Sequence, residues 1–259
     1  MSDLDQLVAK AAAFRALHAG PGMLVMANAW DAASAQRFEA AGFPAIATTS
    51  GGVAISLGYA DHEQAPVEEM LSATARITRA VPALPVTVDL EAGYGLAPDE
   101  IARRVIEAGA VGLNLEDTDH HGNTGLVPAE QQAEHIAAVK AAAHALGVDL
   151  FLNARVDVFI RREGDLESQV AEGTRRGRLY RAAGADSVYP IILSDPAAIR
   201  AMVDACDVIN VTVRRGGPLS LRAAHEAGAR RVTYATSLFR DTMNALDTFA
   251  TEIRADLPT

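Results

Sequence analysis

Three acidic residues stand where two successive apolar runs of the sequence end. Asp89 and Glu91 close the run VTVDLE, and Glu116 follows the run VGLNL. Carboxylates gathered away from water repel one another, and a bound cation relieves that repulsion. Because no cysteine is near and histidines are scattered, ligation by oxygen favours a hard ion, Mg²⁺ or Mn²⁺. The alternative is ordinary strand-end acids, solvated and paired with arginines.

Two further segments are suited to holding an anion. Arg155 follows the run LFLNA, and its guanidinium is the best single cation for clamping a carboxylate through two hydrogen bonds. Ser50, Gly51 and Gly52 follow the run AIATT, and their backbone N–H groups are suited to cradling a carboxylate or phosphate. Each has a structural alternative, since Arg155 also suits pairing with a nearby acid and a glycine pair often only marks a turn.

A histidine pair lies in the glycine-containing segment TDHHGNTGLVP. His120 and His121 precede Gly122 and Gly125, which favour a mobile loop able to close over a substrate. An imidazole titrates near neutral pH, so either histidine can act as a proton donor. The alternative is a pair of solvated loop histidines.

Eight apolar runs recur along the chain, apolar on both faces as buried parallel strands require. They cover residues 23–27, 45–49, 86–90, 111–115, 150–154, 188–192, 208–213 and 232–236. The segments between them read as helices, and four of these end in Ala-Gly just before a run, at Gly42, Gly109, Gly184 and Gly228. Pro98 and Pro128 stand at predicted helix starts.

Eight strand–helix units in about 230 residues predict an α/β fold, a closed (β/α)₈ TIM-type barrel, in a single domain over residues 1–259. The rival doubly wound sheet usually has fewer strands and a glycine-rich nucleotide loop after the first, where this chain has NAWDAASA. In such a barrel the residues just past each strand face one mouth, which brings the acids together.

Composition excludes several functional classes. The chain has 259 residues and a formal net charge of −10, so neither nucleic acid nor an anionic membrane surface is an expected partner. No signal peptide and no apolar run of about 18 residues is visible, and Cys206 is the single cysteine. A cytoplasmic protein acting on a small molecule is predicted.

Four stretches together resemble the isocitrate lyase/phosphoenolpyruvate mutase superfamily. They are TTSGGVAISLGYAD (48–61), VTVDLEAGYG (86–95), GLNLEDTD (112–119) and NARVDVFI (153–160), in the family's order and spacing. The resemblance runs from about Met23 to Leu238. It implies a homo-oligomeric barrel, a dimer or tetramer, that binds Mg²⁺ and a small carboxylate, a 2-oxo acid or its enolate. Many members exchange a terminal helix between subunits, and whether residues 238–255 do so stays open.

The resemblance also implies roles for individual residues. Asp89 matches the direct metal ligand, and Asp61, Glu91 and Glu116 match residues that bind the metal through water. Asn210 and Thr212 resemble substrate contacts of the lyase branch. The residues expected to contact substrate are Ser50, Gly51, Gly52, Asp61, Arg155, Asn210 and Thr212.

The lid segment departs from both branches of the family. Lyases carry a Lys-Lys/Arg-Cys-Gly-His motif whose cysteine supplies the catalytic proton, and this chain has Asp-His-His-Gly-Asn there. His120 or His121 is therefore expected to deliver the proton. The mutase branch has a lysine after its Glu-Asp, where Thr118 stands, and Asn123 matches its lid asparagine.

Three functions follow as alternatives. The first is a Mg²⁺-dependent lyase or decarboxylase that makes or breaks a C–C bond in a 2-oxo or 2-hydroxy diacid through an enolate. The second is a phosphoenolpyruvate phosphomutase or phosphonopyruvate hydrolase-like enzyme acting on a P–C bond. The third is a non-catalytic binder of 2-oxo acids.

Overall fold

The computed structural model describes residues 3–122 and 125–258, and its strands pair in parallel throughout. The strands are β1 (Leu24–Val25), β2 (Ala27–Ala29), β3 (Ile46–Thr48), β4 (Val86–Asp89), β5 (Gly112–Glu116), β6 (Phe151–Val156), β7 (Ser187–Pro190), β8 (Asn210–Thr212) and β9 (Arg231–Thr233). Each of the eight predicted apolar runs contains or overlaps a strand, so the predicted strand positions are confirmed.

The strands close into a barrel of eight, because β1 and β2 are two parts of one strand. β2 pairs with β3 at one end of the run β2–β7, and β1 pairs with β9. Between them, the Met26 N–H donates to the Val232 carbonyl at 3.0 Å. A parallel bridge between Val188 and Ile209 joins β7 to β8. The predicted (β/α)₈ architecture is confirmed.

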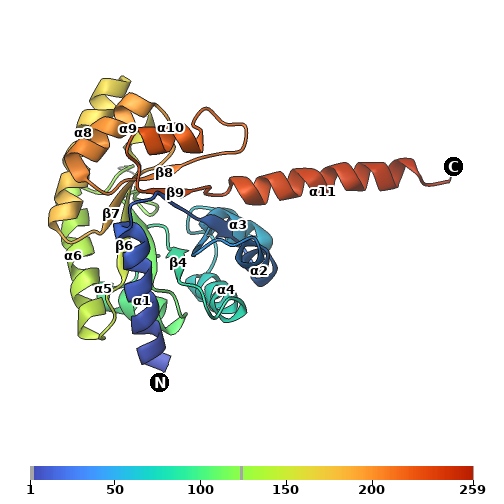
Figure 1. Ribbon diagram of the computed structural model, residues 1–259, viewed down its shortest axis with the longest axis horizontal. Helices are drawn as coiled ribbons and strands as arrows, with labels where there is room; N and C mark the ends of the chain where they lie inside the picture. Colours follow the sequence, from blue (N-terminus) through green and yellow to red (C-terminus); the bar gives the residue numbers. More distant parts are fainter. Residues whose placement is uncertain (1–2, 123–124, 259) are drawn as a thin grey trace.

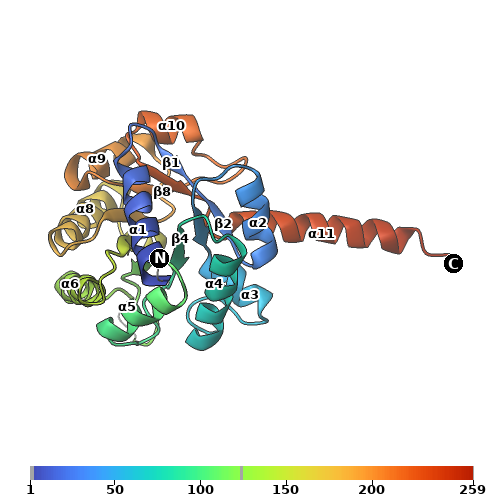
Figure 2. The ribbon, with the colours of Figure 1, turned by 60° about the horizontal axis from the view of Figure 1, so that its bottom comes forward.

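Helices surround the strands (Figure 2). They are α1 (Asp3–Ala19), α2 (Ala32–Ala40), α3 (Ser50–Ser56), α4 (Val67–Ala80), α5 (Pro98–Glu107), α6 (Ala129–Ala145), α7 (Val158–Arg161), α8 (Leu166–Ala182), α9 (Pro196–Cys206), α10 (Leu221–Glu226) and α11 (Ser237–Ala255). The four predicted terminal glycines, Gly42, Gly109, Gly184 and Gly228, have φ between +79° and +101°, the left-handed geometry of a helix C-terminus. No helix among the described residues is long and apolar enough to cross a membrane.

Helix α1 closes the end of the barrel at which the strands begin. Phe14 packs edge-on against Phe151 of β6 at 5.3 Å between ring centroids, and His18 stacks on the same ring at 3.9 Å. The fully buried Arg231 of β9 lies beneath Phe14, 6.0 Å from its ring centre. Since this end is filled, the opposite mouth is the open one.

Helix α11 extends away from the barrel (Figures 1 and 2). Three apolar side chains of the helix, Leu246, Phe249 and Ile253, are exposed in a stripe, and so is Leu257 just beyond the helix. An exposed apolar stripe of this kind is typical of a surface that another chain covers. Exchange of this helix between subunits stays a prediction.

Candidate active site

Asp89 is fixed at the barrel mouth by the neighbouring strands. It ends β4, and its Oδ2 accepts hydrogen bonds from the Ser50 N–H at 3.0 Å and the Ser50 hydroxyl at 2.8 Å. Its Oδ1 accepts a hydrogen bond from Asn114 Nδ2 on β5, at 3.2 Å. These donors orient a carboxylate that is only partly buried and keeps one lone pair, on Oδ1, for a cation.

The Ser50–Gly52 segment forms the first turn of helix α3, where the sequence suggested a loop. Thr49 caps this turn, with its hydroxyl accepting a hydrogen bond from the Gly52 N–H at 3.4 Å. The Ser50 N–H is already bound to Asp89. A Cβ atom on Gly51 would stand 2.5 Å from an Asp61 carboxylate oxygen, so glycine is what allows Asp61 to approach this turn.

Glu91 lies almost wholly out of solvent, with 2% of its surface exposed. Its Oε1 accepts a 2.5 Å hydrogen bond from the Tyr94 hydroxyl, and its Oε2 accepts one from the Glu63 N–H at 2.7 Å. Burial raises the pKa of Glu91 to about 8, and the charges of Glu116 and Asp89 act in the same direction. A bound cation nearby would offset the unfavourable free energy of ionising Glu91 in this buried, acidic environment.

Glu116 and Asp157 share one buried guanidinium. Arg155 Nη1 lies 2.5 Å from Glu116 Oε2, while its Nε and Nη2 donate to the two Asp157 oxygens at 2.7 and 2.8 Å. Burial raises the pKa of Glu116 well above its ordinary value despite this cation. The pKa of Arg155 stands well above normal, because the Asp157 and Glu116 charges outweigh the effect of burial. Arg155 therefore has the structural partners that the sequence left open.

The two lid histidines take different places. His120 Nε2 lies 2.6 Å from Glu116 Oε1, and only 7% of the His120 side chain is exposed. His121 Nε2 lies 2.8 Å from Glu63 Oε2, with 67% of its side chain exposed. Both imidazoles are thus oriented by carboxylates at the mouth. Asn123, which matched the mutase lid, lies outside the described residues.

Asn210 and Thr212 line the barrel interior from β8. Asn210 is fully buried and donates from Nδ2 to the Thr233 hydroxyl at 3.2 Å. The Thr212 hydroxyl lies 2.5 Å from the Tyr189 hydroxyl on β7. Of the two, Thr212 also reaches a cavity.

That cavity has a volume of about 170 Å³ and lies beyond the ends of β6, β7 and β8. Its polar lining comes from Arg162, Ser194, Thr212 and Arg214, and no carboxylate lines it. Among the described residues, neither arginine has an ion-pair partner. Two unpaired cations beside the acidic mouth suit a second anionic group of a ligand.

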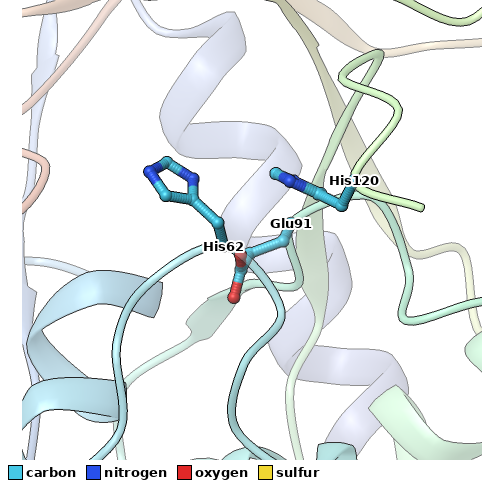
Figure 3. A group of neighbouring side chains, drawn as sticks. All are labelled: His62, Glu91 and His120. Atoms are coloured by element: carbon cyan, nitrogen blue, oxygen red, sulfur yellow. The ribbon is translucent and has the colours of Figure 1, made fainter. Parts of the chain in front are cut away.

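Sequence reasoning missed two residues of the mouth, His62 and Glu63. One ligand atom each of His62, Glu91 and His120 lies within 4.8 Å of the others, and Figure 3 shows these three side chains as neighbours. The only signal was their position directly after Asp61 in the stretch YADHEQ.

Comparison with known proteins gives the following similarities. The family model Phosphoenolpyruvate phosphomutase matches residues 14–254. Rv1998c of Mycobacterium tuberculosis is 35% identical over 188 residues, covering 71% of this chain and 66% of that protein, just under two thirds of its length. 2-Methylisocitrate lyase of Escherichia coli is 33% identical over 246 residues, covering 88% of this chain and 79% of the enzyme. A solved structure from Burkholderia cenocepacia J2315 is 40% identical with a TM-score of 0.86, covering 93% of this chain and 99% of that one.

Proposed function

We propose that this chain, which belongs to the phosphoenolpyruvate mutase/isocitrate lyase superfamily, is a Mg²⁺-dependent carbon–carbon lyase acting on a 2-hydroxy or 2-oxo diacid. The reaction passes through an enolate. The observation that carries the proposal is the concentration of buried carboxylates at the barrel mouth around one permanently charged guanidinium.

The residues at the mouth fit a divalent cation. Glu91 and Glu116 are buried, and their pKa values are raised by burial and by neighbouring acids. Asp61 and Asp89 contribute to the same repulsion. Asp89, Glu91 and Glu116 would hold the ion, with Asp61 beside them. When bound, Mg²⁺ supplies a fixed positive charge for the oxygen on which negative charge develops.

Arg155 retains hydrogen-bonding capacity for a substrate carboxylate. A guanidinium carries five N–H donors, and three are directed at Glu116 and Asp157. The two that remain suit one carboxylate of the substrate, and the acids hold the guanidinium still while it binds. This preorganisation lowers the cost of reaching the transition state.

The bond-breaking step can be written in balance. The 2-hydroxyl group of the substrate gives its proton to one of the carboxylates at the mouth and becomes a carbonyl, and the C–C bond beside it breaks. The electron pair of that bond passes to the carbon next to the second carboxylate, giving an enolate. His120 or His121 then returns a proton to this carbon. Glu116 and Glu63 orient these two imidazoles.

The basic cavity supports a diacid substrate. Arg162 and Arg214 face it without a carboxylate partner, and Thr212 connects it to Tyr189 beside Arg155. A carboxylate remote from the reacting carbons would bind there. A monocarboxylate such as pyruvate alone would leave this cavity unused.

A second candidate is P–C bond chemistry on phosphoenolpyruvate or a phosphonate. The match to the Phosphoenolpyruvate phosphomutase family model over residues 14–254 favours it. Against it stands the lid, where Thr118 occupies the position of the mutase lysine.

Product analysis by ¹H and ³¹P NMR with Mg²⁺ tests the proposal. The substrates are 2-methylisocitrate, 2,3-dimethylmalate, oxaloacetate, phosphoenolpyruvate and phosphonopyruvate, and Asp89→Ala is the control. We expect C–C cleavage of a diacid that stops in Asp89→Ala and in EDTA. Turnover of the phosphorus compounds alone would favour the second candidate. Oxalate binding without any turnover would favour a non-catalytic 2-oxo-acid binder.

A further inference from the structure

Three loops bring a second type of metal ligand to the mouth. His62 lies between α3 and α4, Glu91 follows β4, and His120 follows β5. One ligand atom from each lies within 4.8 Å of the other two, and Figure 3 shows the three side chains as neighbours. The two imidazole rings are 5.6 Å apart between centroids, with planes inclined by 35°.

Hydrogen bonds prepare His120 to act as a ligand. Its Nε2 lies 2.6 Å from Glu116 Oε1. In the tautomer that carries its hydrogen on Nε2, this N–H donates to the carboxylate and Nδ1 keeps its lone pair. A histidine that binds a metal through one nitrogen commonly donates the other N–H to a carboxylate, which fixes the ring and raises its basicity. Glu116 has this role toward His120.

Glu91 is held in the same way. Tyr94 donates to its Oε1 and the Glu63 N–H to its Oε2. Each carboxylate oxygen has two lone pairs, so one remains on each oxygen for a metal. His62 is more exposed, which leaves its ring free to complete the group.

We propose that His62, Glu91 and His120 form a site for a divalent transition-metal ion of the Zn²⁺ class, which shares Glu91 with the proposed Mg²⁺ ligands and differs from them by its two imidazole nitrogens. Imidazole nitrogen favours Zn²⁺, Co²⁺ and Ni²⁺, whereas Mg²⁺ prefers oxygen. Three protein ligands leave coordination positions open to water or a substrate oxygen.

The proposed metal site also assigns different roles to the two lid histidines. His120 binds the ion, and His121, paired with Glu63 at 2.8 Å, is the free imidazole that delivers a proton. This assignment rests on the proposed function, but the metal site itself does not.

Metal titration tests the site without any substrate. Zn²⁺ binding to the full chain is measured by calorimetry in excess Mg²⁺, and Co²⁺ binding by visible absorption. We expect one tight Zn²⁺ ion and Co²⁺ bands stronger than those of the aqueous ion. His62→Asn and His120→Asn are expected to weaken Zn²⁺ binding by about 100-fold, the upper end of the cost of losing even an outer-shell partner.

Two controls keep the test specific. His121→Asn removes the adjacent histidine and His225→Asn an exposed one on α10, and both are expected to bind Zn²⁺ like the wild type. Circular dichroism confirms that each variant is folded. Equal Zn²⁺ affinity in folded His62→Asn, His120→Asn and wild-type protein would overturn the site, as would an unaltered aqueous Co²⁺ spectrum. Neither result bears on turnover, so the lyase proposal is judged separately.

Discussion

Arg155, the penultimate residue of β6, binds Asp157, the residue directly after this strand, through two parallel hydrogen bonds, 2.7 Å from Nε and 2.8 Å from Nη2. Both side chains are buried. Arg155 also contacts Glu116 through Nη1, so its single positive charge lies between two buried carboxylates at the mouth.

Removing this guanidinium is expected to destabilise the fold. Arg155→Ala leaves Asp157 and Glu116 buried without their cation, which costs about 3–5 kcal/mol of unfolding free energy. Urea denaturation at pH 7.5 measures the loss. Arg103→Ala, which removes an exposed pair with Glu107, is the control and should leave the urea midpoint unchanged. A wild-type midpoint in Arg155→Ala would mean that the two acids do not depend on Arg155.

Substitutions in the basic cavity are expected to change the KM of the substrate and to leave kcat nearly unchanged. Arg162→Gln and Arg214→Gln should each raise the KM of the diacid about tenfold, since a charged hydrogen bond contributes about 1.5–3 kcal/mol, and leave kcat within about twofold. Steady-state kinetics measures both. Arg215→Gln alters the neighbouring arginine, which lies 3.7 Å from Asp241 and does not line the cavity. Arg215→Gln is expected to keep the wild-type KM. A KM that is also unchanged in Arg162→Gln and Arg214→Gln would exclude the cavity as a substrate subsite.

His18 predicts acid sensitivity of the fold. Burial, followed by the charge of Arg231, lowers the pKa of His18 from 6.5 to about 3. Between these two pH values His18 is protonated in the unfolded chain and neutral in the folded chain. The stability that depends on neutral His18 is complete above pH 6.5 and is lost as the pH falls toward 3. Between pH 7.5 and 5.5 wild type should lose about 1.4 kcal/mol more than His18→Gln in urea unfolding. Equal losses would show that His18 titrates normally.

The stripe on α11 predicts self-association. Phe249 and Ile253 are 56% and 67% exposed, so an isolated chain would leave them in water. Sedimentation equilibrium should show a dimer or tetramer for the wild type and a smaller species for Phe249→Asp. Thr248→Asp, a substitution beside the stripe, is the control. A monomeric wild type would contradict both the oligomer and the helix exchange.

The barrel could be predicted because its signal is local and repeated. Each strand is a short apolar run, and Gly42 and its three counterparts end their helices in left-handed geometry that favours glycine. The division of the first strand at Met26 has no such signal. Ser50–Gly52 resembled a turn because glycine disfavours helix, yet the Thr49 cap and the Asp89 acceptor stabilise a helical turn there.

The site was only partly predictable for a related reason. Asp89 and Glu116 end their strands and Glu91 follows one, so the topology alone places all three at the mouth. His62 and Glu63 reach it through a loop in which both residues have positive φ, +71° and +55°. Such a backbone conformation depends on tertiary contacts, among them the hydrogen bond from the Glu63 N–H to Glu91. The residue types at these positions do not predict it.

Running the cleavage reaction in D₂O tests whether an enolate forms. An enolate formed by breaking a C–C bond must take its proton from the medium or from an exchanging imidazole. We expect one deuterium on the released carboxylate product, seen by ¹H NMR and mass spectrometry, in a reaction that needs Mg²⁺ and fails in Asp89→Ala. A cleavage product without deuterium would exclude the enolate, and turnover unaffected by EDTA and by Asp89→Ala would exclude the Mg²⁺ site at Asp89.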